Sequence, residues 1–173
     1  LSKVRSVAWT DDRAILGAKL PADLGAAVVR PEPLGGDPLR LRGPFCEDDP
    51  DEPSLWHAFF ASNRRFVSLD LETQIGLDQL TGLVRNADVV LVSEGAFGVT
   101  EANLDASLQA NPALVWVECS SFGREGPWKD YLAPDLVAGA LGGAVSTTGD
   151  ADTPPLKAFG DLNFVVSGCY VAI

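Results

Sequence analysis

Residues 73–92, TQIGLDQLTGLVRNADVVLV, decide the fold class of this chain. In the first part of the stretch, apolar residues recur at helical spacing, which predicts an amphipathic helix over 73–86. The second part, DVVLV, is a short apolar run without polar alternation and predicts a strand over 88–92 that is buried on both faces. A buried strand that follows a helix so closely is typical of an α/β protein.

Strands and helices alternate in the same way on both sides of this stretch. The predicted strands are 4–9, 26–30, 66–71, 88–92 and 114–118, and the predicted helices are 12–24, 73–86, 101–110 (with Thr100 as N-cap) and 133–144. Residues 31–53 are rich in proline and acids and predict a surface loop without regular structure. The alternation indicates a Rossmann-like, three-layer α/β domain with a mainly parallel sheet.

In parallel sheets of this kind, ligands bind outside the carboxyl ends of the strands. We therefore expect the functional residues in the loops that follow Val29, Val92 and Glu118.

Composition limits the classes of function. With 46% hydrophobic residues, the 173-residue chain can form one real core. Its 13 basic and 24 acidic residues give a net charge of −11, which argues against a nucleic-acid partner but leaves room for a local basic pocket. The three cysteines form no zinc-type pair, so we expect no metal site and a reducing, cytoplasmic location. The apolar runs are too short for a membrane span.

Both ends of the sequence suggest a longer polypeptide. The chain contains no methionine at all, and residues 165–173 form an apolar stretch without a polar tail. We expect residues 1–173 to be one α/β region of a longer protein, cut short at its C-terminal side.

Four segments carry a resemblance to a known family. They are ADLGAAVVRPEPLGGDPLR at 22–40, NRRFVSLDL at 63–71, ADVVLV at 87–92, and the set SSFGREGPW, DLVAGALGGAVSTTG and DADTPPLK within 120–157. In this order and at these intervals, they resemble the N-terminal part of the class III CoA-transferases. That family includes formyl-CoA and carnitine-type CoA-transferases and the 2-methylacyl-CoA racemases.

The resemblance implies an activity and its partners. Family enzymes are interlocked dimers that move coenzyme A between an acyl-CoA thioester and a small carboxylic acid. An aspartate carboxylate attacks the thioester and becomes an aspartyl-CoA thioester. We therefore expect acyl-CoA as substrate, no metal, no membrane, and either a homodimer or a partner half within the same chain.

The resemblance also implies a CoA site. CoA carries phosphates, which need cations and backbone N–H groups. Arg64 and Arg65 fall where the family has a basic pair, and Arg30 and Arg40 flank a glycine turn. The other predicted CoA-binding residues are Glu94, Gly123, Gly126 and Asp135.

The catalytic position departs from the family pattern. The nucleophile lies four positions before a glycine that matches Gly168, and that position holds Phe164. Asp161 is the nearest carboxylate and the only local substitute. Pro134 also stands where transferases tend to have tyrosine, and residues 94–98 lack the family's Asn and Arg.

Three readings remain open at this point. The chain is part of an active CoA-transferase, or it is an inactive half that serves as a scaffold or CoA-binding module in a tandem fusion. An unrelated nucleotide-binding module is the third reading, and the motifs at 120–126 and 135–149 argue against it.

Overall fold

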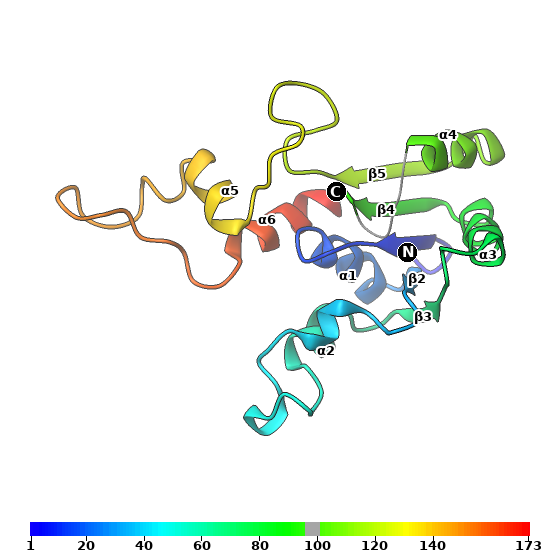
Figure 1. Ribbon diagram of the computed structural model, residues 1–173, viewed down its shortest axis with the longest axis horizontal. Coiled ribbons are helices and arrows are strands. Elements are labelled where there is room, and N and C mark those ends of the chain that lie inside the picture. Colours follow the sequence, from blue (N-terminus) through cyan, green and yellow to red (C-terminus); the bar gives the residue numbers. More distant parts are fainter. Residues whose placement is uncertain (96–100) are drawn as a thin grey trace.

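A five-stranded parallel sheet forms the centre of the computed structural model, which describes residues 1–95 and 101–173 (Figure 1). Its strands are β1 Arg5–Trp9, β2 Ala27–Glu32, β3 Arg65–Ser68, β4 Val89–Ser93 and β5 Val115–Cys119. The strand order is β3-β2-β1-β4-β5, and every neighbouring pair is parallel. The predicted α/β fold with a mainly parallel sheet is confirmed.

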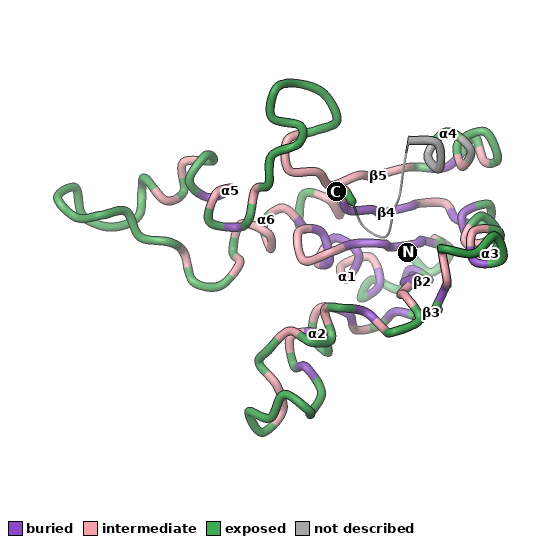
Figure 2. The backbone as a smooth tube through the Cα atoms, in the orientation of Figure 1, coloured by how far each residue is buried: buried purple, intermediate pink, exposed green. Residues whose placement is uncertain are grey.

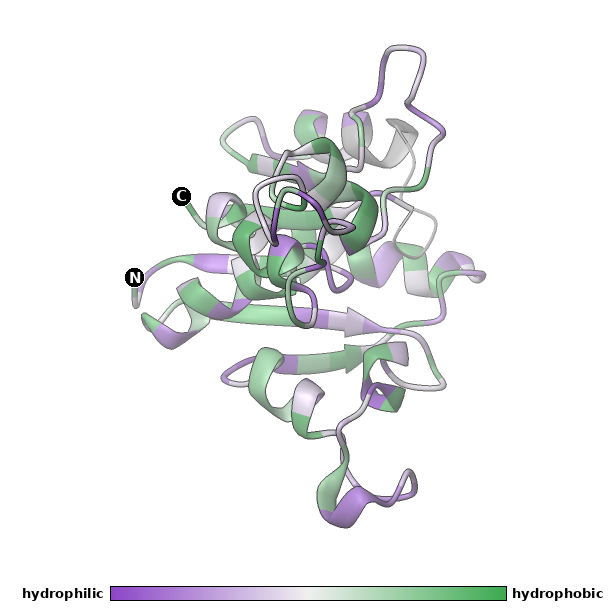
Figure 3. Ribbon diagram, turned by 90° about the vertical axis from the view of Figure 1, so that its left-hand side faces the viewer, coloured by the Kyte–Doolittle hydropathy of each residue, from purple (hydrophilic) through white to green (hydrophobic). Residues whose placement is uncertain are grey.

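Helices cover both faces of the sheet. Helices α1 Ile15–Asp23 and α6 Leu162–Val171 lie on one face, and α3 Gln74–Arg85 and α4 Glu101–Ala110 lie on the other (Figure 1). Successive residues of a strand point to opposite faces. Ala8 accordingly belongs to the core cluster on the α1 side, whereas Val7 belongs to the cluster on the α3 side. Figure 3 shows that hydrophobic residues gather in these strands and helices, while the long loops are largely hydrophilic.

Two glycines allow α1 and α6 to approach each other closely. A Cβ atom on Gly168 would lie 2.7 Å from Cβ of Leu16, and one on Gly17 would lie 2.6 Å from Cγ1 of Val171. Distances this short are not compatible with a side chain at either position. Gly168, the glycine that we matched to the family pattern near the C-terminus, therefore lies where α1 and α6 cross.

The segment between β2 and β3 contains more structure than the sequence predicts. Two 3₁₀ turns, Pro38–Leu41 and Cys46–Asp48, interrupt the stretch that we expected to be an irregular loop. Helix α2 Leu55–Phe60 follows, and the hydroxyl of Ser54 caps it by accepting a hydrogen bond from the backbone N–H of His57 at 3.0 Å. The prediction missed this short helix because six residues are too few to show a helical period.

Two predicted elements are shorter in the structure. Strand β3 ends at Ser68 rather than at residue 71. Helix α5 Asp135–Leu141 ends three residues before the predicted residue 144, and Gly143 takes a positive φ of 85°. Beyond α5, the chain forms an exposed arm over residues 142–160 that extends away from the sheet (Figures 1 and 2).

Helix α1 begins three residues later than predicted, and α6, which covers most of the apolar stretch at residues 165–173, was not predicted as a helix. The other two helices, α3 and α4, agree with prediction. Helix α3 begins after Thr73, whose hydroxyl accepts a hydrogen bond from the N–H of Gly76, and α4 has the predicted bounds. Thr100, the expected N-cap of α4, lies outside the described residues. Within the described part of the chain, none of the helices combines the length and the apolar character needed to cross a membrane.

Candidate functional site

The order in which the strands are added to the sheet changes side between β1 and β4. Strands β2 and β3 lie to one side of β1, and β4 and β5 lie to the other. Such a switch point leaves a crevice at the carboxyl ends of the strands, where α/β proteins bind ligands. A cavity of about 200 Å³ lies there, lined by Thr10, Asp11, Arg30, Asp37, Pro38, Leu39, Glu94 and Gly95. The predicted convergence of the loops after β2 and β4 is therefore present.

Arg13 joins three strand ends at this crevice. Its guanidinium donates hydrogen bonds to the Asp11 carboxylate (2.6 and 2.8 Å), to the carbonyl oxygen of Glu94 (2.7 Å) and to the hydroxyl of Ser121 (3.0 Å). Burial opposes its charge, but the hydrogen bond and the charge of Asp11 outweigh burial and raise the pKa of Arg13. The loop after β5 thus joins those after β1 and β4.

Arg30 lies inside the protein and is fully engaged there. Its Nε is 2.5 Å from Oδ2 of Asp37, and both side chains are only 1% exposed. The other two guanidinium nitrogens donate to the hydroxyl and the carbonyl oxygen of Thr10 at 3.0 and 2.7 Å. Although burial works against the carboxylate, the hydrogen bond and charge of Arg30 lower the pKa of Asp37. The structure therefore gives Arg30 a protein partner on each of its nitrogens.

Of the other three arginines that we predicted to bind CoA, one is buried and two are exposed. Arg64 is only 9% exposed and donates from Nη2 to the carbonyl oxygens of Ile15 (2.8 Å) and Phe60. Burial lowers the pKa of Arg64 to about 9. Arg65 is exposed, and so is Arg40, which forms an ion pair with Glu32 at 3.1 Å.

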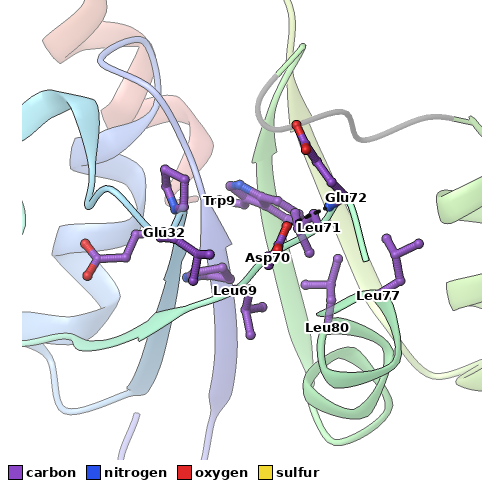
Figure 4. A pocket seen from close by; sticks show the side chains of 11 residues that line it. Trp9, Glu32, Leu69, Asp70, Leu71, Glu72, Leu77 and Leu80 are labelled. Atoms are coloured by element: carbon purple, nitrogen blue, oxygen red, sulfur yellow. Dashed lines mark hydrogen bonds between the residues drawn. The ribbon is translucent and has the colours of Figure 1, made fainter. Parts of the chain in front are cut away.

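A larger cavity of about 610 Å³ lies beside the crevice, at the carboxyl ends of β1, β2 and β3 (Figure 4). Trp9, the leucines that follow β3 and the leucines of α3 give it apolar walls, and Glu32, Asp70 and Glu72 add carboxylates. In Figure 4, the carboxyl groups of Glu32 and Glu72 extend to opposite sides of the Trp9 ring. No lysine or arginine lines this cavity among the described residues.

The predicted glycines of the loop after β5 have left-handed backbone conformations. Gly123 has a φ of 80° and Gly126 a φ of 102°, and a Cβ atom on either would meet nothing within 4 Å. The backbone conformation, rather than lack of space, therefore favours glycine at both positions. Gly123 also lines a cavity of about 220 Å³ together with Glu94, Gly95 and Arg124.

Asp135 is buried where α5 meets α6. Its carboxylate accepts hydrogen bonds from the backbone N–H of Phe164 (3.0 Å) and from the side-chain amide of Asn163 (2.9 Å). It lies 4.0 Å from the ammonium of Lys157. Because the first N–H groups of a helix lack partners within the helix, Asp135 acts here as a cap for α6.

Asp161 precedes α6 and is held by an arginine. Its carboxylate forms an ion pair with Nη2 of Arg42, whose Nη1 lies 2.7 Å from Asp12. The Arg42 guanidinium also stacks on the ring of Trp56, 4.4 Å from the ring centroid. Burial raises the pKa of Asp12, which shares Arg42 with Asp161. Asp161 and Phe164 are thus both fixed by contacts at the start of α6, and Phe164 presents a phenyl ring rather than a carboxylate.

Sequence reasoning missed Arg13, Asp11 and Arg42. We had restricted the site to the loops after the second, fourth and fifth strands, whereas Asp11 and Arg13 follow the first. Charged residues directly after a buried first strand were the available signal. In the described residues 1–95 and 101–173, no group of three or more acidic, cysteine or histidine side chains is arranged to hold a metal ion.

Comparison with known proteins finds a CoA-transferase family model and relatives named as CoA-transferases. The family model described as "CoA-transferase family III" matches residues 14–173. The chain is 36% identical over 155 residues to succinate--glutarate CoA-transferase of Agrobacterium fabrum, covering 86% of this chain and 39% of that protein. It is 37% identical over 140 residues to formyl-CoA:oxalate CoA-transferase of Streptomyces avermitilis, covering 80% of this chain and 33% of that protein.

Solved structures agree on the fold. A CAIB/BAIF family protein from Brucella suis superposes with a TM-score of 0.88 at 24% identity, covering 99% of this chain and 46% of that one. The protein Rv3272 from Mycobacterium tuberculosis superposes with a TM-score of 0.84 at 25% identity, covering 99% and 48%. The chain therefore spans less than half the length of these relatives.

Proposed function

Since the chain belongs to CoA-transferase family III, we propose that the protein containing it moves coenzyme A from an acyl-CoA thioester to a small carboxylic acid. The match of the family model over residues 14–173 carries this proposal. The CoA-transferase names of two relatives more than 35% identical to this chain support it. We place the reaction in the cytoplasm, because the cysteine usage suits a reducing compartment.

The chemistry requires one carboxylate of the protein. That carboxylate attacks the thioester carbonyl, and the CoA thiolate leaves as a mixed anhydride forms. The thiolate then attacks the carbonyl on the protein side, which releases the donor acid and leaves CoA bound as a protein thioester. The acceptor carboxylate reverses both steps and departs as the new acyl-CoA.

The exposed arginines are the best remaining partners for the CoA phosphates. Arg40 and Arg65 have guanidinium groups at the surface, whereas Arg30 and Arg64 are buried. All three guanidinium nitrogens of Arg30 bond to protein oxygens, and Arg64 bonds to protein oxygens through Nη2, while its buried Nε and Nη1 have no hydrogen-bond partner in the described part of the chain. An incoming phosphate could reach Arg30 only by displacing its bonds to Thr10 or Asp37. We therefore assign phosphate binding to Arg40 and Arg65, and binding of the acyl-pantetheine end to the crevice beside Glu94 and Gly123.

We further propose that the nucleophile comes from outside this chain. The family position for the nucleophile carries Phe164, and a phenyl ring cannot attack a thioester. Asp161 would have to release Arg42 and turn away from Asp12 before it could act. Near-attack geometry tolerates little displacement. These contacts favour the second reading, in which residues 1–173 form an inactive half beside an active one.

Trapping the covalent intermediate tests both proposals. The whole protein is incubated with acyl-CoA and then with hydroxylamine, and peptide mass spectrometry locates the modified carboxylate. We expect an adduct on an aspartate outside residues 1–173, unchanged in the Asp161→Asn variant. An adduct on Asp161 would show that this half supplies the nucleophile. Absence of both adduct and CoA exchange with any acyl-CoA tested would overturn the CoA-transferase proposal itself.

A further inference from the structure

We propose that Arg13 is a positioning residue that sets the width of the ligand crevice by holding the loop after β4 between the loops after β1 and β5. This inference rests on the proposed function, because it concerns the same crevice. Arg13 lies outside the four segments that carry the family resemblance.

The guanidinium of Arg13 bonds to residues of three different loops. Nε and Nη2 of Arg13 both donate to Oδ2 of Asp11, and Nη2 also donates to the carbonyl oxygen of Glu94. Nη1 donates to the hydroxyl of Ser121 and lies 3.6 Å from Oε2 of Glu94. A planar guanidinium can make these bonds in three directions at once, and a lysine ammonium cannot match that geometry.

The partners of Arg13 form further hydrogen bonds, with one another and with Ser93. The backbone N–H of Ser121 donates to Oε2 of Glu94 at 3.1 Å, and the backbone N–H of Asp11 donates to the hydroxyl of Ser93 at 3.0 Å. The backbone N–H of Arg13 itself donates to Oδ1 of Asp11 at 3.0 Å. Glu94 is thus held at its carbonyl oxygen and at its carboxylate, by two different loops.

Glu94 lies between two cavities. Glu94 and Gly95 line both the cavity of about 200 Å³ near Thr10 and the cavity of about 220 Å³ near Gly123. They form a wall that the two cavities share. A shift of this wall enlarges one cavity at the expense of the other, so the residue that fixes Glu94 also fixes the space offered to a ligand.

Removal of the Arg13 side chain should displace the wall formed by Glu94 and Gly95. The Asp11 and Glu94 carboxylates would face each other with no cation between them, and like charges at short range repel. Both side chains are about one-third exposed, so water can solvate them after they separate. The loss should therefore move the wall rather than unfold the sheet, whose core clusters contain neither residue.

The experiment uses the whole protein with the variants Arg13→Ala and Arg13→Lys. The matched control is Arg5→Ala, since Arg5 forms an exposed ion pair with Asp88 at the opposite end of the sheet. The measurements are KM and kcat for acyl-CoA, CoA affinity by calorimetry, thermal midpoint, and amide hydrogen exchange at residues 93–95 and 119–123.

We expect Arg13→Ala to raise KM and weaken CoA binding tenfold or more, with a much smaller change in kcat and a thermal midpoint close to that of the parent protein. Exchange should accelerate at Gly95 and Ser121. Arg13→Lys should recover less than half of the CoA-binding free energy that Arg13→Ala loses. Lysine restores the positive charge, but its ammonium cannot donate hydrogen bonds in the three directions that the guanidinium uses. Arg5→Ala should change none of these quantities.

Two results would overturn the proposal. One is an Arg13→Ala protein with exchange at Gly95 and Ser121 equal to that of the parent. The other is faster exchange there with CoA affinity unchanged. If the parent protein neither catalyses CoA transfer nor binds CoA, the proposed function is wrong. The hydrogen-exchange data would still show whether Arg13 holds the crevice in place. In that case the crevice would bind a ligand other than CoA.

Discussion

At the scale of single residues, the buried Arg30–Asp37 pair has the largest predicted effect on stability. A buried ion pair contributes little net stability as a pair, but removing one partner leaves an uncompensated charge in the interior. We expect Arg30→Ala to lower the free energy of unfolding by about 3–5 kcal/mol in denaturant titration. The control Arg40→Ala, whose guanidinium is exposed, should cost less than about 1 kcal/mol. Equal losses in the two variants would contradict the buried-pair interpretation.

A substitution at Arg65 tests CoA binding without affecting folding stability. Its side chain is exposed, so its removal should leave stability almost unchanged. A charged hydrogen bond to phosphate is worth roughly 1.5–3 kcal/mol, so Arg65→Ala should weaken CoA binding in the whole protein by an order of magnitude or more. Calorimetry at two salt concentrations measures this effect. An affinity equal to that of the parent would exclude Arg65 from the site, whereas Arg64→Ala cannot serve as the test because Arg64 is buried.

His57 should make stability depend on pH. Burial, with the nearby charge of Arg40, lowers the pKa of His57 below its ordinary value of 6.5, so the unfolded chain takes up a proton that the folded chain resists. The stability from neutral His57 is therefore complete above about pH 6.5 and is lost as pH falls, by at most about 1.4 kcal/mol per pH unit. Denaturant titrations between pH 5.5 and 7.5 measure the slope. The slope should be shallower in His57→Gln, and identical slopes would show that other groups cause the dependence.

At the scale of elements, the crossing of α1 and α6 depends on small residues. A methyl group at position 168 would meet Cβ of Leu16 at 2.7 Å and the backbone nitrogen of Gly17 at 3.1 Å, so the helices must separate. We expect Gly168→Ala to lower the free energy of unfolding by about 1–3 kcal/mol. The control Gly82→Ala, in an exposed position of α3 with open space around it, should raise stability by about 0.5–1 kcal/mol. A neutral Gly168→Ala would mean that the crossing is looser than it appears.

Regular elements were predictable wherever a period or a buried run is long enough to detect. Helix α3 shows a helical period, and the strands β4 and β5 are buried apolar runs, so all three were found within a residue or two. Helix α2 is too short for a period, and the early end of α5 depends on the positive φ of Gly143.

The candidate site was less predictable than the fold because its bonds cross the sequence. The sequence places Arg64 beside Arg65 at the mouth of a strand, but only the fold decides that one is buried and the other exposed. Arg13 reaches Ser121, 108 positions away in the chain, and no local pattern announces such a contact. Asp135 looks like a ligand-binding residue within its motif, yet its partners come from the start of α6.

At the scale of the whole molecule, the part of the chain beyond β5 exposes many large apolar side chains. Phe159 is 99% exposed and Leu132 87%, both on segments outside the sheet and its core clusters, and Tyr170 is 76% exposed on α6, the helix that packs against α1. A surface of this kind is typical of an interface rather than of an isolated protein. This surface agrees with our prediction that the chain packs against a second copy of itself or against a partner half. It also predicts that residues 1–173 alone will associate.

Light scattering over a range of concentrations measures this association. We expect an average mass that rises above one chain as concentration increases, because burying exposed apolar surface is favourable by roughly 25 cal/mol per Å². Changing Phe159, Leu132 and Tyr170 together to serine should reduce the association while leaving the circular dichroism of the sheet unchanged, since none of the three belongs to the core. Ile75→Ser is the matched control, because Ile75 is 73% exposed but lies on α3, on the opposite face of the sheet from α6. Equal reduction by the control would mean that the contact is non-specific, and a monomer at every concentration would show that this apolar surface does not drive association.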